Sequence, residues 1–196
     1  MRKIETEAEK KKRQRRNQWI IGIILIFVML GSTLGYAFTS ITKDTDTNTN
    51  SQINYNGFSF QKVSSYWLLN LGSSSFYFIY NPKEISNLSV PTTNLSYLNN
   101  YNGKPLYVYS ENPEANLEIY QNLQNVALRM QSACFEKSKC QGDWPLKDCT
   151  NNFIIIENSS TQKIEQKENC VFIEGKSEDL TKLTDKFLYK IIGVEQ

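Results

Sequence analysis

The chain has 196 residues, 40% of them hydrophobic, and a formal net charge of +2. It contains no histidine, which excludes the usual Ser-His-Asp and Cys-His catalytic arrangements and every metal site with a histidine ligand. The small net charge hides an asymmetry. Residues 1–18 hold 8 of the 22 basic residues and only 3 of the 20 acidic ones, so this tail carries +5 and the remainder −3. A mildly acidic remainder argues against nucleic-acid binding there.

An uncharged run of residues from Trp19 to Phe38 follows the basic tail. A helix of ~20 residues matches the ~30 Å hydrocarbon core of a bilayer, so we predict a transmembrane helix over residues 19–39. Positive charge stays on the cytoplasmic side, which predicts a cytoplasmic tail and a C-terminal domain outside the cell. We expect the tail to set this orientation beside anionic lipid rather than to bind nucleic acid.

Two patterns within this run carry further hypotheses. Gly35-Tyr36-Ala37 is a small-x-small cleavage pattern, so a cleaved signal peptide is the alternative interpretation. The length of the apolar run and of the basic tail favours an uncleaved anchor. Gly31 and Gly35 form a small-xxx-small pattern, through which two spans could associate as a homo-oligomer.

Residues 40–54 are polar and nearly free of apolar anchors. Such a segment cannot bury enough surface to offset the entropy lost on ordering, so we expect a flexible linker. Folding signals begin at Tyr55, and we predict one extracytoplasmic domain over residues 55–196.

The first half of this domain contains aromatic-rich runs at 58–63, 66–71 and 76–80, separated by Gly and Ser. Such runs predict an antiparallel β-meander, which ends at Pro82 because proline cannot continue a ladder. A short helical turn at 82–88 and a loop to residue 103 are expected next. Tyr66, Asn70 and Tyr77 alternate with core positions and are predicted to form an aromatic outer face, either solvated or in contact with a partner.

The second half has a different pattern. A strand at 105–110 precedes a helix expected over 113–133, with Asn112 at its cap, Pro113 as its first residue and an apolar stripe that begins at Leu117. A cysteine-bearing segment over 134–149, expected as a loop, comes next. A buried strand at 152–157 and a hairpin of 163–166 with 170–174 follow. A last helix is expected after Ser177, with an apolar stripe. The order predicts an α+β fold, with a β-meander and then a β-α-β-β-α unit on a mixed sheet.

All four cysteines lie in the predicted outer domain, where an even number indicates disulfide bonds. Three connectivities exist, and we favour Cys134–Cys140 with Cys149–Cys170. A thiol–disulfide oxidoreductase with a thioredoxin-like C-terminal half is the alternative, but no Cys-x-x-Cys motif is present and Cys134 is expected at the unfavourable C-terminal end of a helix. A four-cysteine zinc site is disfavoured because no pair has the two-residue spacing such sites use.

Other candidate residues carry weaker signals. Glu111 ends a strand before a helix, where active sites can occur, and Asp143 and Asp148 share the cysteine loop. Nothing in their spacing pairs them, and Glu111 also suits the helix N-terminus. No glycine-rich phosphate loop is present, and no cofactor is expected. Three sites fit the glycosylation pattern, at Asn87, Asn94 and Asn158.

Four segments carry a resemblance: Phe76-Tyr-Phe-x-Tyr-Asn-Pro82, Tyr107-x-Tyr-Ser-x-Asn-Pro113, Asp148-Cys149 and Asn169-Cys-Val-Phe-Ile-Glu-Gly175. Together they resemble uncharacterised single-pass membrane proteins of archaea with a C-terminal α+β ectodomain, over most of residues 55–196. The resemblance implies no activity and no catalytic, binding or metal residue. The sequence therefore predicts a non-catalytic, membrane-anchored domain that binds a partner or belongs to a cell-surface assembly, with a carboxylate-dependent hydrolase as the weakest alternative.

Overall fold

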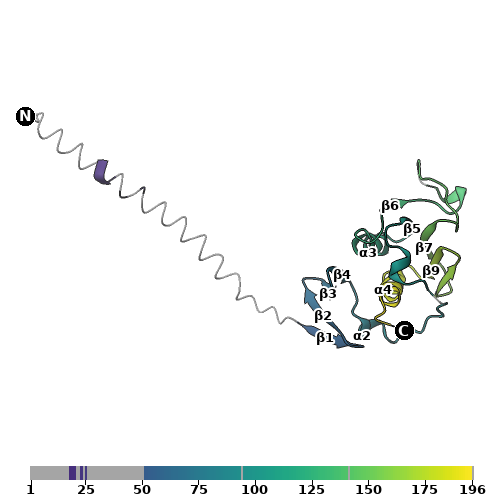
Figure 1. Ribbon diagram of the computed structural model, residues 1–196, viewed down its shortest axis with the longest axis horizontal. Helices are drawn as coiled ribbons and strands as arrows, with labels where there is room; N and C mark the ends of the chain where they lie inside the picture. The colour runs from purple at the N-terminus through teal and green to yellow at the C-terminus, as the bar shows by residue number, and fades with distance from the viewer. Residues whose placement is uncertain are drawn as a thin grey trace, which may run out of the picture. The chain divides into compact units, whose positions relative to one another are not determined.

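The structure, a computed structural model of the whole chain, describes residues 18–20, 23, 25, 51–93, 95–140 and 142–195 (Figure 1). The chain divides into two compact units, Met1–Thr49 and Asn50–Gln196. In the first unit the described residues are helical. Within the described part of the chain, no helix is both long enough and apolar enough to span a membrane. Most of the span predicted at 19–39, with Gly31 and Gly35, lies outside the described residues, as do residues 1–17 and 40–50.

The first sheet of the second unit is a four-stranded antiparallel meander in the order β1-β2-β3-β4 (Figure 1). Its strands are β1 (Gln52–Tyr55), β2 (Phe58–Val63), β3 (Tyr66–Leu71) and β4 (Ser74–Phe78). Two-residue turns join them, and in the first turn Asn56 and Gly57 have φ values of 47° and 83°. These positive values suit a type I′ turn, which matches the twist of a hairpin. The predicted meander is confirmed.

Strand β1 was not predicted, and it begins at Gln52 inside the expected linker. It pairs with β2 through Ile53↔Phe60 and Tyr55↔Phe58. The Asn-Gly turn needs a strand on each side, so it was the available signal for β1. The four residues of β1 are too short a run to stand out without that partner.

The second sheet has five strands in the order β6-β5-β7-β9-β8. They are β5 (Pro105–Ser110), β6 (Arg129–Ser132), β7 (Asn152–Asn158), β8 (Lys163–Lys167) and β9 (Cys170–Gly175). All neighbours are parallel except β8, which forms an antiparallel hairpin with β9. The α+β class, the mixed sheet and this hairpin are therefore confirmed.

Three α-helices and two short 3-10 helices complete the unit: α2 (Pro82–Ile85), α3 (Pro113–Leu123), α4 (Leu180–Ile191), η2 (Leu98–Asn100) and η3 (Lys137–Lys139). The predicted start of α3 is confirmed, because the Asn112 side chain accepts a hydrogen bond of 2.9 Å from the Ala115 N–H. The start of α4 is corrected, since its cap is Asp179 and not Ser177.

The helix expected over 113–133 is also corrected. It ends at Leu123, and residues 129–132 form β6, so the unit is β-α-β-β-β-β-α rather than β-α-β-β-α. Polar and apolar residues alternate from Leu128 onward, a period of two that is short enough to be read as part of the helical stripe. Strand β6 exists because the open edge of β5 pairs with it.

Helices α3 and α4 lie between the two sheets (Figure 1). One core joins the inner faces of β2, β3 and β4, both helices and one face of the second sheet. The other face of the second sheet carries a smaller cluster, in which Tyr107, Tyr109, Phe153 and Ile155 pack against Phe135 and Trp144 of the cysteine-bearing segment. This segment therefore takes the place of a helix layer on that face.

Candidate functional site

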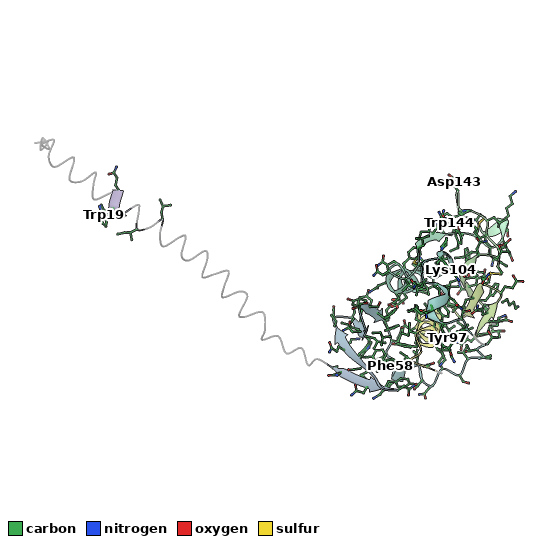
Figure 2. All side chains as sticks on the ribbon, viewed as in Figure 1. Trp19, Phe58, Tyr97, Lys104, Asp143 and Trp144 are labelled. Atoms are coloured by element: carbon green, nitrogen blue, oxygen red, sulfur yellow. A yellow bond between two sulfur atoms is a disulfide. The ribbon has the colours of Figure 1, made fainter. Side chains whose placement is uncertain are left out.

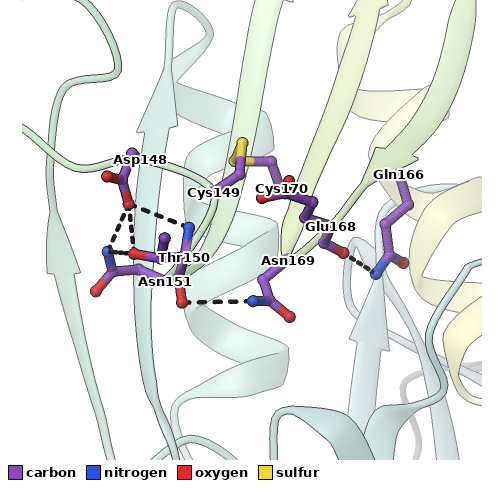
Figure 3. Close-up of a disulfide and its surroundings, with 8 residues drawn as sticks. All are labelled: Asp148, Cys149, Thr150, Asn151, Gln166, Glu168, Asn169 and Cys170. Atoms are coloured by element: carbon purple, nitrogen blue, oxygen red, sulfur yellow. Dashed lines mark hydrogen bonds between the residues drawn. A yellow bond between two sulfur atoms is a disulfide. The ribbon is translucent and has the colours of Figure 1, made fainter.

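Both predicted disulfides are present, Cys134–Cys140 and Cys149–Cys170, with Cα–Cα distances of 5.0 and 4.9 Å. The second bridge ties the end of the cysteine-bearing segment to the first residue of β9, as Figure 3 shows. Because Cys134 and Cys170 are fully buried, these bridges are placed to hold the segment on the sheet.

The geometry gives little support to redox chemistry. No cysteine in the described residues is free. Cys134 follows strand β6, so its expected position at a helix C-terminus is wrong. A reactive thiol needs an exposed, electropositive setting such as a helix N-terminus. Neither buried cysteine has one.

The three carboxylates singled out from the sequence are not brought together as a pair. Glu111 accepts hydrogen bonds from the Asn158 N–H (2.8 Å) and the Tyr109 hydroxyl (3.3 Å). Asp148 accepts hydrogen bonds from Thr150 and Asn151 in a turn. These bonds lower the pKa of Asp148, and those from Thr150 have the largest effect. Asp143 is exposed and makes no polar contact with any described residue. Glu111 thus connects the ends of β5 and β7, and the other two lie in exposed turns.

A carboxyl pair that the sequence did not reveal lies inside the core. Glu118 of α3 is 1% exposed and Asp185 of α4 is 0% exposed. Burial raises the pKa of Glu118 to about 7, and burial together with the neighbouring Glu118 charge raises the pKa of Asp185. The two carboxyl groups interact, and the oxygens Glu118 Oε1 and Asp185 Oδ1 have no hydrogen-bond partner of their own. Burial and mutual repulsion therefore favour the protonated form of the pair.

This pair belongs to a polar cluster that binds the backbone leaving β4. Asn122 accepts from the Tyr77 N–H (2.8 Å) and donates to the Tyr77 carbonyl (2.7 Å). Asp185 accepts from the Tyr80 N–H (2.8 Å), and the Tyr189 hydroxyl donates to the Tyr80 carbonyl (2.6 Å). The outer edge of β4 would otherwise bury unpaired backbone groups against the helices, so the cluster has a structural role.

The sequence missed this cluster because the stripe of α3 was assigned to the wrong side chains. Leu117 was expected in the stripe and is 54% exposed. The buried positions of α3 are 115, 118, 119, 122 and 123, which include Glu118 and Asn122. Their i, i+3, i+4, i+7 spacing was a signal, but two polar members hid it from a search for apolar residues.

The outer face of the first sheet is defined by ten side chains on the side of the strands opposite Phe60, Leu69 and Phe76: Gln52, Asn54, Ser59, Gln61, Val63, Tyr66, Leu68, Asn70, Ser75 and Tyr77. None is charged, and each is at least partly exposed. Apolar and aromatic neighbours gather at one end, through the pairs Val63↔Tyr66 and Leu68↔Tyr77. Tyr66, Asn70 and Tyr77 thus lie where the sequence placed them.

Two of the predicted glycosylation sites can be located. Asn87 follows α2 and Asn158 ends β7, and both are exposed. Asn94 lies outside the described residues. The glycosylation of all three stays a prediction.

Comparison with protein families, with curated proteins and with solved structures finds no match to this chain. The fold and its bridges define the class, an α+β domain with two sheets and two disulfides.

Proposed function

We propose that this protein is a membrane-anchored binding module of the cell exterior, and that the outer face of the first sheet contacts another cell-surface protein. The composition of that face is the observation that carries the proposal. Protein interfaces are depleted in charge at their centres and enriched in aromatic residues, and the outer face has both properties. The domain would act by contact and not by catalysis.

The rest of the chain supports an outward position. Disulfides persist in oxidising compartments, and both bridges here connect segments of the same domain. The +5 tail before an apolar run favours a cytoplasmic N-terminus, so the domain would face outward. Self-association through Gly31 and Gly35 would be a separate, membrane-embedded contact.

The ordered polar side chains of the face also suit a protein partner. Hydrogen bonds within the face hold its polar side chains, from Gln52 to Ser59 (2.6 Å) and from Ser75 to Asn70 (2.7 Å). A pre-ordered polar rim beside an apolar patch costs less side-chain entropy on binding than mobile lysines would. Tyrosine, serine and asparagine are also enriched in antibody contact surfaces, where tyrosine gives contact area at low entropy cost and serine and asparagine give hydrogen bonds.

Photocrosslinking in native membranes tests this proposal. A photoreactive phenylalanine analogue replaces Leu68 on the outer face or, as the matched control, Leu128, which is 69% exposed and lies beside β6. We expect position 68 to capture one discrete protein and position 128 none, and Leu68→Lys to abolish co-purification of that protein. Equal capture from both positions, or from neither, would refute the proposal. Capture of a second copy of the chain would also refute a distinct partner.

A further inference from the structure

A small polar cavity of about 200 Å³ lies at the amino ends of the parallel strands. Lys104 directly precedes β5, Asn152 begins β7 and Asn169 directly precedes β9. Because these strands are parallel, all three residues lie at the same end of the sheet. Strand β8 is antiparallel to β9, so Gln166, near the carboxyl end of β8, lies at this same end of the sheet. Lys104 is labelled in Figure 2, and Figure 3 shows the carboxamides of Gln166 and Asn169 pointing the same way.

One wall of the cavity is fixed by hydrogen bonds. Gln166 accepts from the Ser96 N–H (2.7 Å) and donates to the Ser96 hydroxyl (2.8 Å) and to the Glu168 carbonyl (2.9 Å). The Cys149–Cys170 bridge holds the neighbouring turn, next to Asn169. The wall is therefore formed before any ligand arrives, which lowers the entropy cost of binding.

Asn169 donates a hydrogen bond to the Thr150 carbonyl (3.4 Å), and the remaining polar side chains of the lining are unused. The side chains of Asn100, Lys104 and Asn152 have no hydrogen-bond or ion-pair partner among the described residues. Tyr101 is 3% exposed, with its ring in the core, and its hydroxyl likewise has no partner in the described part of the chain. The hydroxyl is not among the fully buried polar atoms that lack a partner, so it is accessible from the cavity. Such a group at a cavity wall is well placed to bind a ligand.

The chemistry of the lining selects the ligand. Most binding pockets for organic molecules are lined mainly by apolar side chains, and this lining is almost wholly polar. Lys104 is the only charged residue among the described residues of the lining, so the cavity favours one negative charge. Side-chain amides donate and accept hydrogen bonds, as sugar hydroxyl groups also do. The volume admits one small molecule.

We propose that this cavity binds a single acidic sugar unit, with its carboxylate against Lys104 and its hydroxyls against Tyr101 and the asparagine amides. Burial raises the pKa of Tyr101, so its hydroxyl stays protonated and available as a donor. The site lies apart from the outer face of the first sheet, and it stands whether or not that face binds a protein.

Titration calorimetry on the full chain in detergent micelles tests the site, with sodium glucuronate, glucose and sodium acetate as probes. We expect saturable binding of glucuronate that is at least tenfold tighter than that of the other two probes. Lys104→Gln should weaken it about tenfold, because a charge-assisted contact is lost. Tyr101→Phe, which retains the buried ring, should weaken it several-fold. Lys176→Gln is the control. Lys176 is exposed and follows the carboxyl end of β9, so it lies at the opposite end of the strands from the cavity.

Three results would overturn the proposal. The first is the absence of saturable glucuronate binding in the unaltered chain. The second is binding that neither Lys104→Gln nor Tyr101→Phe weakens. The third is binding of acetate or glucose as tight as that of glucuronate. The cavity would then recognise only the carboxylate or only the hydroxyl groups of the ligand.

Discussion

Replacing Glu118 by glutamine removes an ionisable group from the core, keeps the shape of the side chain and puts a neutral hydrogen-bonding amide in place of the carboxyl group. In the folded chain the pKa of Glu118 is about 7, whereas in the unfolded chain it has the ordinary value of 4.5. The folded state therefore binds more protons between these values, so its stability falls as the pH rises through this window. A shift of this size corresponds to about 3 kcal/mol.

The Glu118→Gln chain should therefore match the unaltered chain at pH 4 and exceed its free energy of unfolding by about 3 kcal/mol at pH 8. Urea unfolding of the full chain in micelles, followed by tryptophan fluorescence, measures both values. Glu136→Gln serves as the control, because the Glu136 side chain is exposed and makes no hydrogen bond or ion pair with the described residues. A difference that is the same at both pH values, or one that is larger at pH 4, would refute the reasoning.

Three further changes test the packing. Gly175→Ala should lower the free energy of unfolding by about 1–3 kcal/mol, because the added methyl overlaps a buried leucine of α4; an unchanged midpoint would contradict this contact. Replacing Cys149 and Cys170 together by serine should cost about 3 kcal/mol, more than removing the shorter Cys134–Cys140 bridge, and the reverse order would contradict the loop argument. Asn122→Leu should speed hydrogen exchange at the edge of β4, whereas exposed Asn125→Leu should leave it unchanged.

Local signals in the sequence were sufficient where the structure depends on neighbours in the chain. The meander follows from aromatic runs with two-residue turns, and the start of α3 from Asn112 and Pro113. The favoured disulfide pairing was correct because one pair closes a short loop and the other joins adjacent strand ends. Each of these features is encoded within a few residues or by the spacing of the cysteines.

The features that were missed depend on distant partners. Strand β6 is only four residues long, and its pairing with β5 gives it a place in the sheet. Glu118 and Asp185 are 67 positions apart in the sequence and come together only when α3 packs on α4. The polar cavity draws its lining from four segments of the chain. Sequence patterns do not reveal contacts between residues this far apart in the chain.

The measurement that tests the central claim most directly is proteolysis of intact cells. Proteinase K added outside should cut the expected linker at 40–54 and release the folded domain with both disulfides intact, while the N-terminal tail stays cell-bound. A cytoplasmic protein that survives the treatment serves as the control for intact membranes. A domain that remains uncut until the cells are lysed, with its four cysteines reduced, would contradict an outward-facing, anchored binding module.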